Sequence, residues 1–332
     1  MILILSTDGD LSTDEVIIYL MKKGIKFFRL NDNDIFKYEI SFTLSKNKKD
    51  IPDFYIDTGD TILTSDEIST VWFRKFGFFE NAPIYQEFKK VFGSPFLQQI
   101  MSEYIGTLNL ICKCLEEKKW LANYKSTRPN KLFILNSAKA LGIKVPESVV
   151  ANSKYAIKKL FKEKIIAKSL TDSTFIKTDQ KEILGMYTIG LSTLMKKMPD
   201  FFLHTLIQDE INKNYEIRTF FIDNNFFSMA IFSQRDPLTQ TDFRKYNFER
   251  PNRYVPYKLD KDIEIKLNIL LNNYNINTAS IDLIYSRDSE ILLLEINPCG
   301  QFGMISKSCN YPLEEIVANT LIKFDYENQK TF

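Results

Sequence analysis

An aliphatic run near the end of the chain leads directly into two oxygen-bearing side chains. The segment "ILLLEINPCGQFG" begins at Ile291 and delivers Glu295 and Asn297 just before Pro298. Residues two apart in a strand share a face, so this carboxylate and this amide lie side by side. Polar groups at the end of a buried run lose hydration, and a protein rarely tolerates that loss without compensation.

A second apolar run upstream, "ASIDLIYS", supplies a facing carboxylate, Asp282. The polar residues 287–290 between the two runs are turn-forming, which predicts a β-hairpin. With the turn centred on the two middle residues of that segment, Asp282 lies directly opposite Glu295, with Cβ atoms about 4.5–5.5 Å apart. Mg²⁺ binds a few carboxylates together with nucleotide phosphates and water. We therefore predict a magnesium site at Asp282, Glu295 and Asn297. The alternative is that the carboxylates are exposed or salt-bridged and that the asparagine only begins a turn.

The composition excludes several other classes of function. The chain has 332 residues, with 44 Lys and Arg against 42 Asp and Glu, a balance that argues against a protein that coats nucleic acid. Its apolar stretches are too short, or too often interrupted by polar residues, for a signal peptide or a membrane span. We therefore expect a cytoplasmic protein of two or three domains that binds neither nucleic acid nor membrane.

Cysteine and histidine chemistry is also disfavoured. The four cysteines show no C-x-x-C spacing, and the single histidine, His204, cannot complete a zinc site with them. Because the chain has a single histidine, Ser-His-Asp and Cys-His catalysis are also disfavoured. We expect reduced, structural cysteines and an incidental histidine.

The elements that must position the magnesium ligands predict an α/β protein. The chain opens with a strand, a helix and a strand over residues 1–6, 14–24 and 25–31, as in a βαβ unit. The glycine fingerprint of a dinucleotide site does not follow the first strand. A further strand over residues 71–79 and one or two long helices over residues 84–118 complete this first domain.

A polar connection over residues 120–129 separates this domain from the rest of the chain. Beyond it, apolar periodicity predicts alternating helices, strands and hairpins. They are a helix from Asn130 to near Gly142, a strand over 162–170 whose apolar run ends at Lys168, a hairpin over 171–189, a helix around Leu191–Met198, a strand over 201–211, a hairpin over 215–234, a helix over 260–273 and the final hairpin. We place three domains at residues 1–122, 123–207 and 208–332.

The order of these motifs resembles a known family. A strand with Asp, a hairpin partner with Glu-x-Asn and the tail "NPCGQF" are similar to the C-terminal signature of the ATP-grasp carboxylate–amine ligases. Together with "VWFRK", "IIAKSL", "LIQDEI" and "EIR", they resemble the graspetide synthetases of the grasp-with-spasm maturase type. This implies an α/β (α+β) fold with three-domain ATP-grasp architecture, in which an N-terminal α/β domain precedes two lobes that enclose ATP. Unlike many ATP-grasp enzymes, the chain has no glycine in "LTDSTFIKTDQ", so no close-fitting phosphate cradle is evident there.

The resemblance also implies cofactors and a role for each of several polar residues. ATP and Mg²⁺ would be bound together. Lys131 and Lys168 would contact the ATP phosphates, Gln208, Asp209 and Ile211 would form the adenine-side hinge, Glu216 would lie near the ribose, Arg218 and Arg244 would hold the transferring phosphate, and Asp282, Glu295 and Asn297 would bind the metal.

Taken alone, the same residues leave alternatives open. Lys168 ends an apolar strand, where its ammonium group meets an anion or snorkels to water. Lys131 opens a helix, where a positive charge is unfavourable unless an anion binds nearby, or it is simply a surface lysine. Arg218 shares a strand face with Glu216 and is also compatible with a plain cross-strand ion pair, and Arg244 is compatible with a solvated loop position.

The activity implied by the resemblance is that of an ATP-dependent peptide ligase. It would phosphorylate Asp or Glu side chains of a ribosomally made precursor peptide and form esters with Thr or Ser, or amides with Lys. The leader segment of that peptide would dock near residues 172–198, and the enzyme would be a homodimer or higher homo-oligomer. Two rivals remain: an ATP-grasp ligase that acts on small amino acids or adds glutamate to a protein tail, and a non-catalytic ATP-binding regulator.

Overall fold

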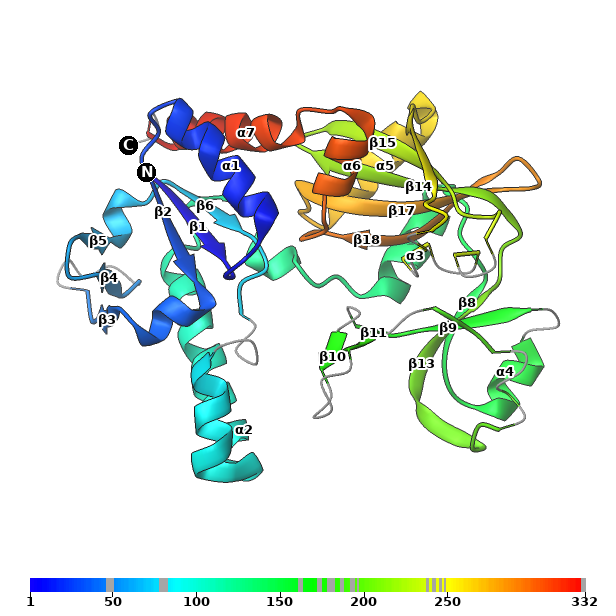
Figure 1. Ribbon diagram of the computed structural model, residues 1–332, viewed down its shortest axis with the longest axis horizontal. Helices are drawn as coiled ribbons and strands as arrows, with labels where there is room; N and C mark the ends of the chain where they lie inside the picture. Colours follow the sequence, from blue (N-terminus) through cyan, green and yellow to red (C-terminus); the bar gives the residue numbers. More distant parts are fainter. Residues whose placement is uncertain are drawn as a thin grey trace. The chain divides into compact units, whose positions relative to one another are not determined.

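The structure, a computed structural model, forms two compact units (Figure 1). One unit contains Met1–Tyr124 together with Pro312–Phe332, and the other contains Lys125–Tyr311. The described residues are 1–45, 51–77, 83–160, 164–171, 175–177, 183–185, 188–191, 195, 197–236, 239–240, 243–244, 247 and 249–329. None of the helices in this part of the chain is both long and apolar enough to span a membrane.

The first unit is built on a parallel sheet with the strand order β2-β1-β6-β7. Strand β1 is completely buried, as expected for a continuous apolar run at the centre of a parallel sheet. The predicted strand–helix–strand start is confirmed, because β1 pairs in parallel with β2 across the connecting helix α1. The elements are β1 (Ile2–Ser6), α1 (Leu11–Lys22), β2 (Phe27–Asn31), β6 (Thr70–Phe73) and β7 (Lys119–Leu121).

The predicted strand over residues 71–79 is shorter in the structure. Strand β6 ends at Phe73 because Lys75, with φ +55°, and Gly77, with φ +109°, turn the backbone into the left-handed region. The long helix α2 (Pro83–Cys114) consists of two helical segments that meet at Gly93, where φ is +71°. This agrees with the prediction of one or two helices there.

A small antiparallel sheet and a C-terminal helix complete the first unit. Strands β3 (Glu39–Thr43), β4 (Asp53–Asp57) and β5 (Ile62–Thr64) form the sheet, which the sequence analysis did not anticipate. Helix α7 (Leu313–Gln329) packs against α1 and the parallel sheet. We predicted that a C-terminal lobe would run over residues 208–332. The structure differs, because the apolar side of α7 completes the core of the first unit.

The second unit begins with a sheet of the order β12-β9-β13-β8, which we call the central lobe. Helix α4 covers one face, where Ile157 packs with Ile165 and Ile207. The predicted hairpin is present as β10 and β11, but its tip and most of the predicted helix around Leu191–Met198 lie outside the described residues. The elements are β8 (Ser148–Ser153), α4 (Lys154–Leu160), β9 (Ile165–Lys168), β10 (Phe175–Lys177), β11 (Ile183–Gly185), β12 (Ile189–Gly190) and β13 (Phe201–Asp209).

A second sheet, of the order β16-β15-β14-β17-β18, forms what we call the C-terminal lobe. Helices α3 and α5 bury their apolar sides against one face of this sheet. Helix α6 lies on the other face, where Phe302 at its start packs on Phe220 (Figure 1). The elements are α3 (Lys131–Ala140), β14 (Lys213–Ile222), β15 (Asn225–Phe232), β16 (Arg253–Tyr257), α5 (Lys261–Asn273), β17 (Thr278–Ser286), β18 (Ile291–Asn297) and α6 (Gly303–Cys309).

Candidate active site

The hairpin of β17 and β18 brings the predicted magnesium ligands together. Asp282 pairs directly with Glu295, and Ser280 pairs with Asn297, so all four side chains leave the same face of the sheet. The opposite face carries Ile281 and its neighbours in the core under α3 and α5. The predicted pairing of the two carboxylates is confirmed.

The register nearer the turn differs from the prediction. There Leu283 pairs with Leu293, one residue out of step with the pairs below, and the register shifts between Asp282 and Leu283. Leu294 is the extra residue of this β-bulge, and it lines the cavity described below. Because of the bulge, Leu294 and Glu295 both reach the cavity side while Leu293 stays in the core.

Each carboxylate of the pair already has a cationic partner. Lys131 Nζ lies 3.3 Å from Glu295 Oε2, and the Asn297 amide donates to Glu295 Oε1 at 3.0 Å. Arg218 Nη1 donates to Asp282 Oδ1 at 3.2 Å. The alternative of salt-bridged carboxylates is therefore also present, in the same place as the proposed metal ligands.

The predicted alternative for Arg218, a cross-strand ion pair, is present, because its partner Asp282 lies on the neighbouring strand β17. Glu216 on the same strand as Arg218 binds Lys213, whose Nζ lies 2.6 Å from Glu216 Oε1, and it also accepts a hydrogen bond from Ser233. A register shift between Lys213 and Tyr215 allows this buried pair on β14. The sequence analysis missed Lys213, because residues three apart in a regular strand point to opposite faces and the register shift that brings it to Glu216 was not predicted.

Burial and charge shift the acidities of these groups in opposite directions. Burial alone would raise the pKa of Glu295, but Lys131 and Lys168, together with the Asn297 amide, lower it to about 2. Burial raises the pKa of Asp282; Arg218 opposes that shift, and the charge of Glu295 adds to it. Burial lowers the pKa of Lys168, and Glu295 opposes the shift. Glu295 is therefore the firmly ionised member of the pair.

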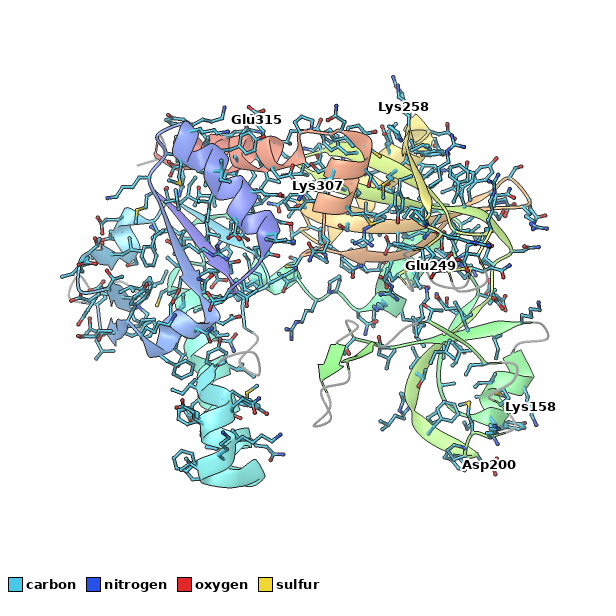
Figure 2. All side chains as sticks on the ribbon, viewed as in Figure 1. Lys158, Asp200, Glu249, Lys258, Lys307 and Glu315 are labelled. Atoms are coloured by element: carbon cyan, nitrogen blue, oxygen red, sulfur yellow. The ribbon has the colours of Figure 1, made fainter. Side chains whose placement is uncertain are left out.

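A cavity of about 630 Å³ contains most of the predicted site residues. It lies between the central and C-terminal lobes and has the size of a small-molecule site. Nine of the predicted residues line it: Lys131, Lys168, Asp209, Ile211, Glu216, Arg218, Arg244, Asp282 and Glu295. Lys158 on α4 and Asp200 lie at the far end of the central lobe, away from β17 and β18 (Figure 2).

Gln208 does not line this cavity, in contrast to its predicted place in the adenine hinge. Its side chain is completely buried, and its Nε2 donates to Ser148 Oγ at 2.9 Å. The alternation of strand β13 explains this position, because the neighbouring Asp209 reaches the cavity and Gln208 points the other way. Ile166, Lys164 and Ile284 line the cavity instead, and the sequence analysis did not single them out.

The loop after β18 is held by an unusually close approach to β17. The Gly300 N–H donates to the Asn297 carbonyl at 3.0 Å, and Ser280 Oγ donates to the Gln301 carbonyl at 2.8 Å. A Cβ atom at Gly300 would lie only 2.3 Å from Ser280 Cβ. Only glycine therefore fits here, and the contact fixes the backbone on either side of Asn297.

The donor set fits a hard cation such as Mg²⁺. Two carboxylates and an amide share one face, and Mg²⁺ usually takes one or two carboxylates plus phosphate oxygens and water. In the described part of the chain no group of three or more His, Cys, Asp or Glu side chains could hold a metal, so a metal held by protein ligands alone is not indicated there. The site suits a metal that arrives with an anionic ligand.

Comparison with known proteins adds family information. Residues 1–128 match the family model of the MvdD pre-ATP grasp domain. A search of curated proteins gives no match. The chain resembles the solved structure of the macrocyclase MdnC bound with precursor peptide MdnA from Microcystis aeruginosa, with 23% identity, a TM-score of 0.81 and coverage of 97% of this chain and 99% of that chain.

Two further structures have the same fold. A Chryseobacterium gregarium RiPP-associated ATP-grasp ligase in complex with ADP and a leader and core peptide shows 23% identity and a TM-score of 0.80, over 97% of this chain and 96% of that chain. The ATP-grasp ligase PsnB complexed with minimal precursor, Mg and ADP shows 13% identity and a TM-score of 0.74, over 98% and 97% of the two chains. Residues 1–128 thus match the MvdD-type pre-ATP-grasp domain, and the chain as a whole has the fold of these ATP-grasp ligases, as the sequence predicted.

Proposed function

We propose that the protein is an ATP-dependent ligase that activates carboxyl side chains of a ribosomally made peptide. The observation that carries this proposal is the single cavity in which Asp282 and Glu295 face each other among Lys131, Lys168 and Arg218. Facing carboxylates suit a divalent cation, and the surrounding cations suit the phosphates that such a cation accompanies. ATP and Mg²⁺ are therefore the proposed cofactors.

The first half-reaction would make a mixed anhydride. A carboxylate oxygen of an Asp or Glu side chain of the peptide attacks the γ-phosphorus of ATP, the bond to the β–γ bridging oxygen breaks, and ADP leaves. Lys131 and Lys168 neutralise charge on the phosphates, and Arg218 and Arg244 hold the phosphoryl group in transfer. Magnesium, when held by Asp282, Glu295 and Asn297, would supply further neutralisation at the phosphates.

The second half-reaction would form the cross-link. A Thr or Ser hydroxyl, or a Lys amine, attacks the acyl carbon, phosphate leaves with the electrons of the C–O bond, and the proton of the nucleophile passes to solvent. The product is an ester or an amide, and the peptide has lost one water for each link. The cavity wall at Asp209, Ile211 and Glu216 would hold the adenosine end of the nucleotide meanwhile.

The peptide partner is supported by the similar structures. MdnC was solved with a precursor peptide, and the Chryseobacterium ligase with a leader and core peptide. By that likeness, we propose that the leader docks near residues 172–198, a region that includes the β10–β11 hairpin. Docking the leader away from the chemistry raises the local concentration of reacting side chains, so contacts to the core can be weak.

Self-association and a reducing compartment are proposed as well. On α2, Phe92 and Phe96 stack 5.1 Å apart with 47% and 55% of their surfaces exposed, which favours a homodimer or higher homo-oligomer. None of the four cysteines forms a disulfide, which is the usual state in a reducing compartment. Sedimentation velocity at several protein concentrations would test the self-association, and a purely monomeric protein would contradict it.

The proposal is tested with the purified protein, ATP, Mg²⁺ and a candidate precursor encoded beside it. We expect peptide-dependent ADP release and, by mass spectrometry, the loss of one water per link. Asp282→Asn is the negative control, because it removes the negative charge of one proposed metal ligand. ADP release with amino acids but not with peptides would favour the small-substrate ligase, and tight ATP binding without ADP release would favour a regulator.

A further inference from the structure

Both carboxylates of the proposed metal site accept from nitrogen donors. Lys131 lies 3.3 Å from one Glu295 oxygen, and the Asn297 amide donates to the other at 3.0 Å. Arg218 contacts both oxygens of Asp282, at 3.2 and 3.4 Å. A magnesium ion needs oxygen ligands at about 2.0–2.1 Å, so on Glu295 Oε2 it would lie close to the ammonium group in its present position, and the two cations would repel each other.

Lys131 is placed so that it can leave this position. It is the first residue of α3, and its side chain is 12% exposed. Its Nζ also lies 3.3 Å from the carbonyl oxygen of Thr171 and 3.5 Å from that of Ser169, at the end of β9. These are neutral partners at long distances, so the carboxylate of Glu295 is its only anionic partner within the described residues. A phosphate oxygen would offer the ammonium group a stronger interaction than the two carbonyls do.

The charges at this end of the cavity favour a metal and a nucleotide together over either alone. Among the described residues at this end, Lys131, Lys168 and Arg218 are cations beside the two carboxylates. A free divalent cation would add positive charge there, whereas ATP, with its roughly four negative charges, supplies the negative charge that such a cation then partly offsets.

We propose that Lys131 acts as a built-in substitute for the metal, so that Mg²⁺ enters only with the nucleotide whose phosphates draw Lys131 away from Glu295. This inference rests on the proposed nucleotide site and adds an order of binding to it. Without nucleotide, Lys131 neutralises Glu295 and excludes the cation. With nucleotide, the lysine moves to a phosphate and leaves a carboxylate oxygen to the metal.

The test measures binding of Mn²⁺, a paramagnetic stand-in for Mg²⁺, from the amplitude of the free-ion EPR signal. Wild type, Lys131→Met and Lys139→Met are compared without nucleotide. Lys139 is the matched control, because it lies on the same helix in an exposed pair with Glu147 at 2.8 Å. We expect Lys131→Met to bind Mn²⁺ about tenfold or more tightly than wild type, and Lys139→Met to behave as wild type.

Further variants tie the gain to the site. The double variant Lys131→Met, Glu295→Gln should lose the tighter Mn²⁺ binding of Lys131→Met, because the side chain that Lys131 neutralised is then no longer charged. Adding the ATP analogue AMP-PNP tightens Mn²⁺ binding more in wild type than in Lys131→Met, because only wild type must move the lysine. Circular dichroism checks folding, and Lys131→Gln must shift Mn²⁺ binding in the same direction.

Three results would overturn the inference. They are unchanged or weaker Mn²⁺ binding in Lys131→Met, an equal gain in Lys139→Met, and a gain that survives loss of Glu295. None of these readouts depends on turnover. Failure to release ADP with any peptide would refute the proposed function. The Mn²⁺ binding of the Lys131 variants would still test the role of Lys131 on its own.

Discussion

Replacing Gly300 by alanine tests how the loop beyond β18 holds the proposed metal ligands. The added Cβ would lie 2.3 Å from Ser280 Cβ, 2.5 Å from Ser280 Oγ and 2.9 Å from the Asn297 carbonyl oxygen. Ordinary carbon contacts are about 3.5–4.0 Å, so the loop and β17 must separate by more than about 1 Å. That separation would stretch the 2.8 Å hydrogen bond from Ser280 to Gln301 beyond its useful range.

The cost follows from these two effects. Overpacking strain contributes about 1–3 kcal/mol, and a broken buried hydrogen bond contributes about 1–3 kcal/mol. We expect Gly300→Ala to lower the unfolding free energy by about 2–6 kcal/mol, measured by urea denaturation followed by circular dichroism. Gly106→Ala is the matched control, because nothing lies within 4 Å of its added Cβ on α2.

A second substitution separates the steric clash between residues 300 and 280 from any general effect of replacing a glycine. Ser280→Gly removes the two closest contacts and leaves only the Asn297 carbonyl, so the double variant should recover part of the loss. A coupling of about 1 kcal/mol or more between the two sites is expected, since the residues touch. The reasoning would be refuted by a Gly300→Ala protein as stable as wild type, or by losses at Gly300 and Ser280 that simply add.

Two further predictions follow from the charged groups. Glu295→Gln should reduce peptide-dependent ADP release at least about 100-fold while the protein stays folded, since the variant keeps the side-chain volume but not the charge; normal ADP release from a folded variant would remove Glu295 from the proposed metal role. Asp10 is 6% exposed and forms ion pairs with Arg74 and Lys75. Burial alone would raise the pKa of Asp10, but these two cations lower it to about 2. Its contribution of about 2 kcal/mol is therefore present at neutral pH and lost as pH falls from about 4 to 2. Asp10→Asn should be destabilised by about that amount in urea at pH 7 and approach wild type near pH 2.5, and an equal gap at both pH values would contradict this.

The regular parts of the fold could be predicted because local patterns determine them. The buried run of β1, the helix ended by Gly24 and the turn at Asp223 and Asn224, both with positive φ, all have signals within a few residues. The small sheet β3–β5 has no such signal, since its strands are short and only partly buried. The return of α7 to the first unit depends on contacts with residues far away in the chain, which periodicity cannot reveal.

The predicted carboxylate pair is correct although the predicted turn was not. We centred the turn between Asp288 and Ser289, whereas the pairs beside the turn are centred on Asp288 alone, because Ser289 adopts φ +62°. The bulge at Leu294 inserts one residue and restores the predicted register below it. Two departures of one residue thus cancel at Asp282 and Glu295, which explains why the ligand geometry was anticipated and the strand irregularity was not.

The cations of the site were predicted by type but not by partner. That Lys131 opens α3 was clear from the sequence, but its contact with Glu295 depends on how α3 packs against β18. Arg218 forms the cross-strand ion pair that the sequence allowed, but which carboxylate it meets, Asp282 on β17, depends on which strand lies next to β14. Pair formation across strands requires the order of the sheet, which the sequence alone does not supply.

Helix α7 has a consequence for how the chain acquires its structure during synthesis. The first unit draws its residues from both ends of the polypeptide, and Val317, Leu321 and Phe324 of α7 are almost completely buried in it. While the ribosome makes the intervening residues, the apolar surface of α1 and the parallel sheet that α7 later covers is exposed to solvent. Nascent chains in this state are the ones most exposed to aggregation and to chaperones, so premature termination before residue 313 would harm the N-terminal domain even though every residue of its sheet had already been translated.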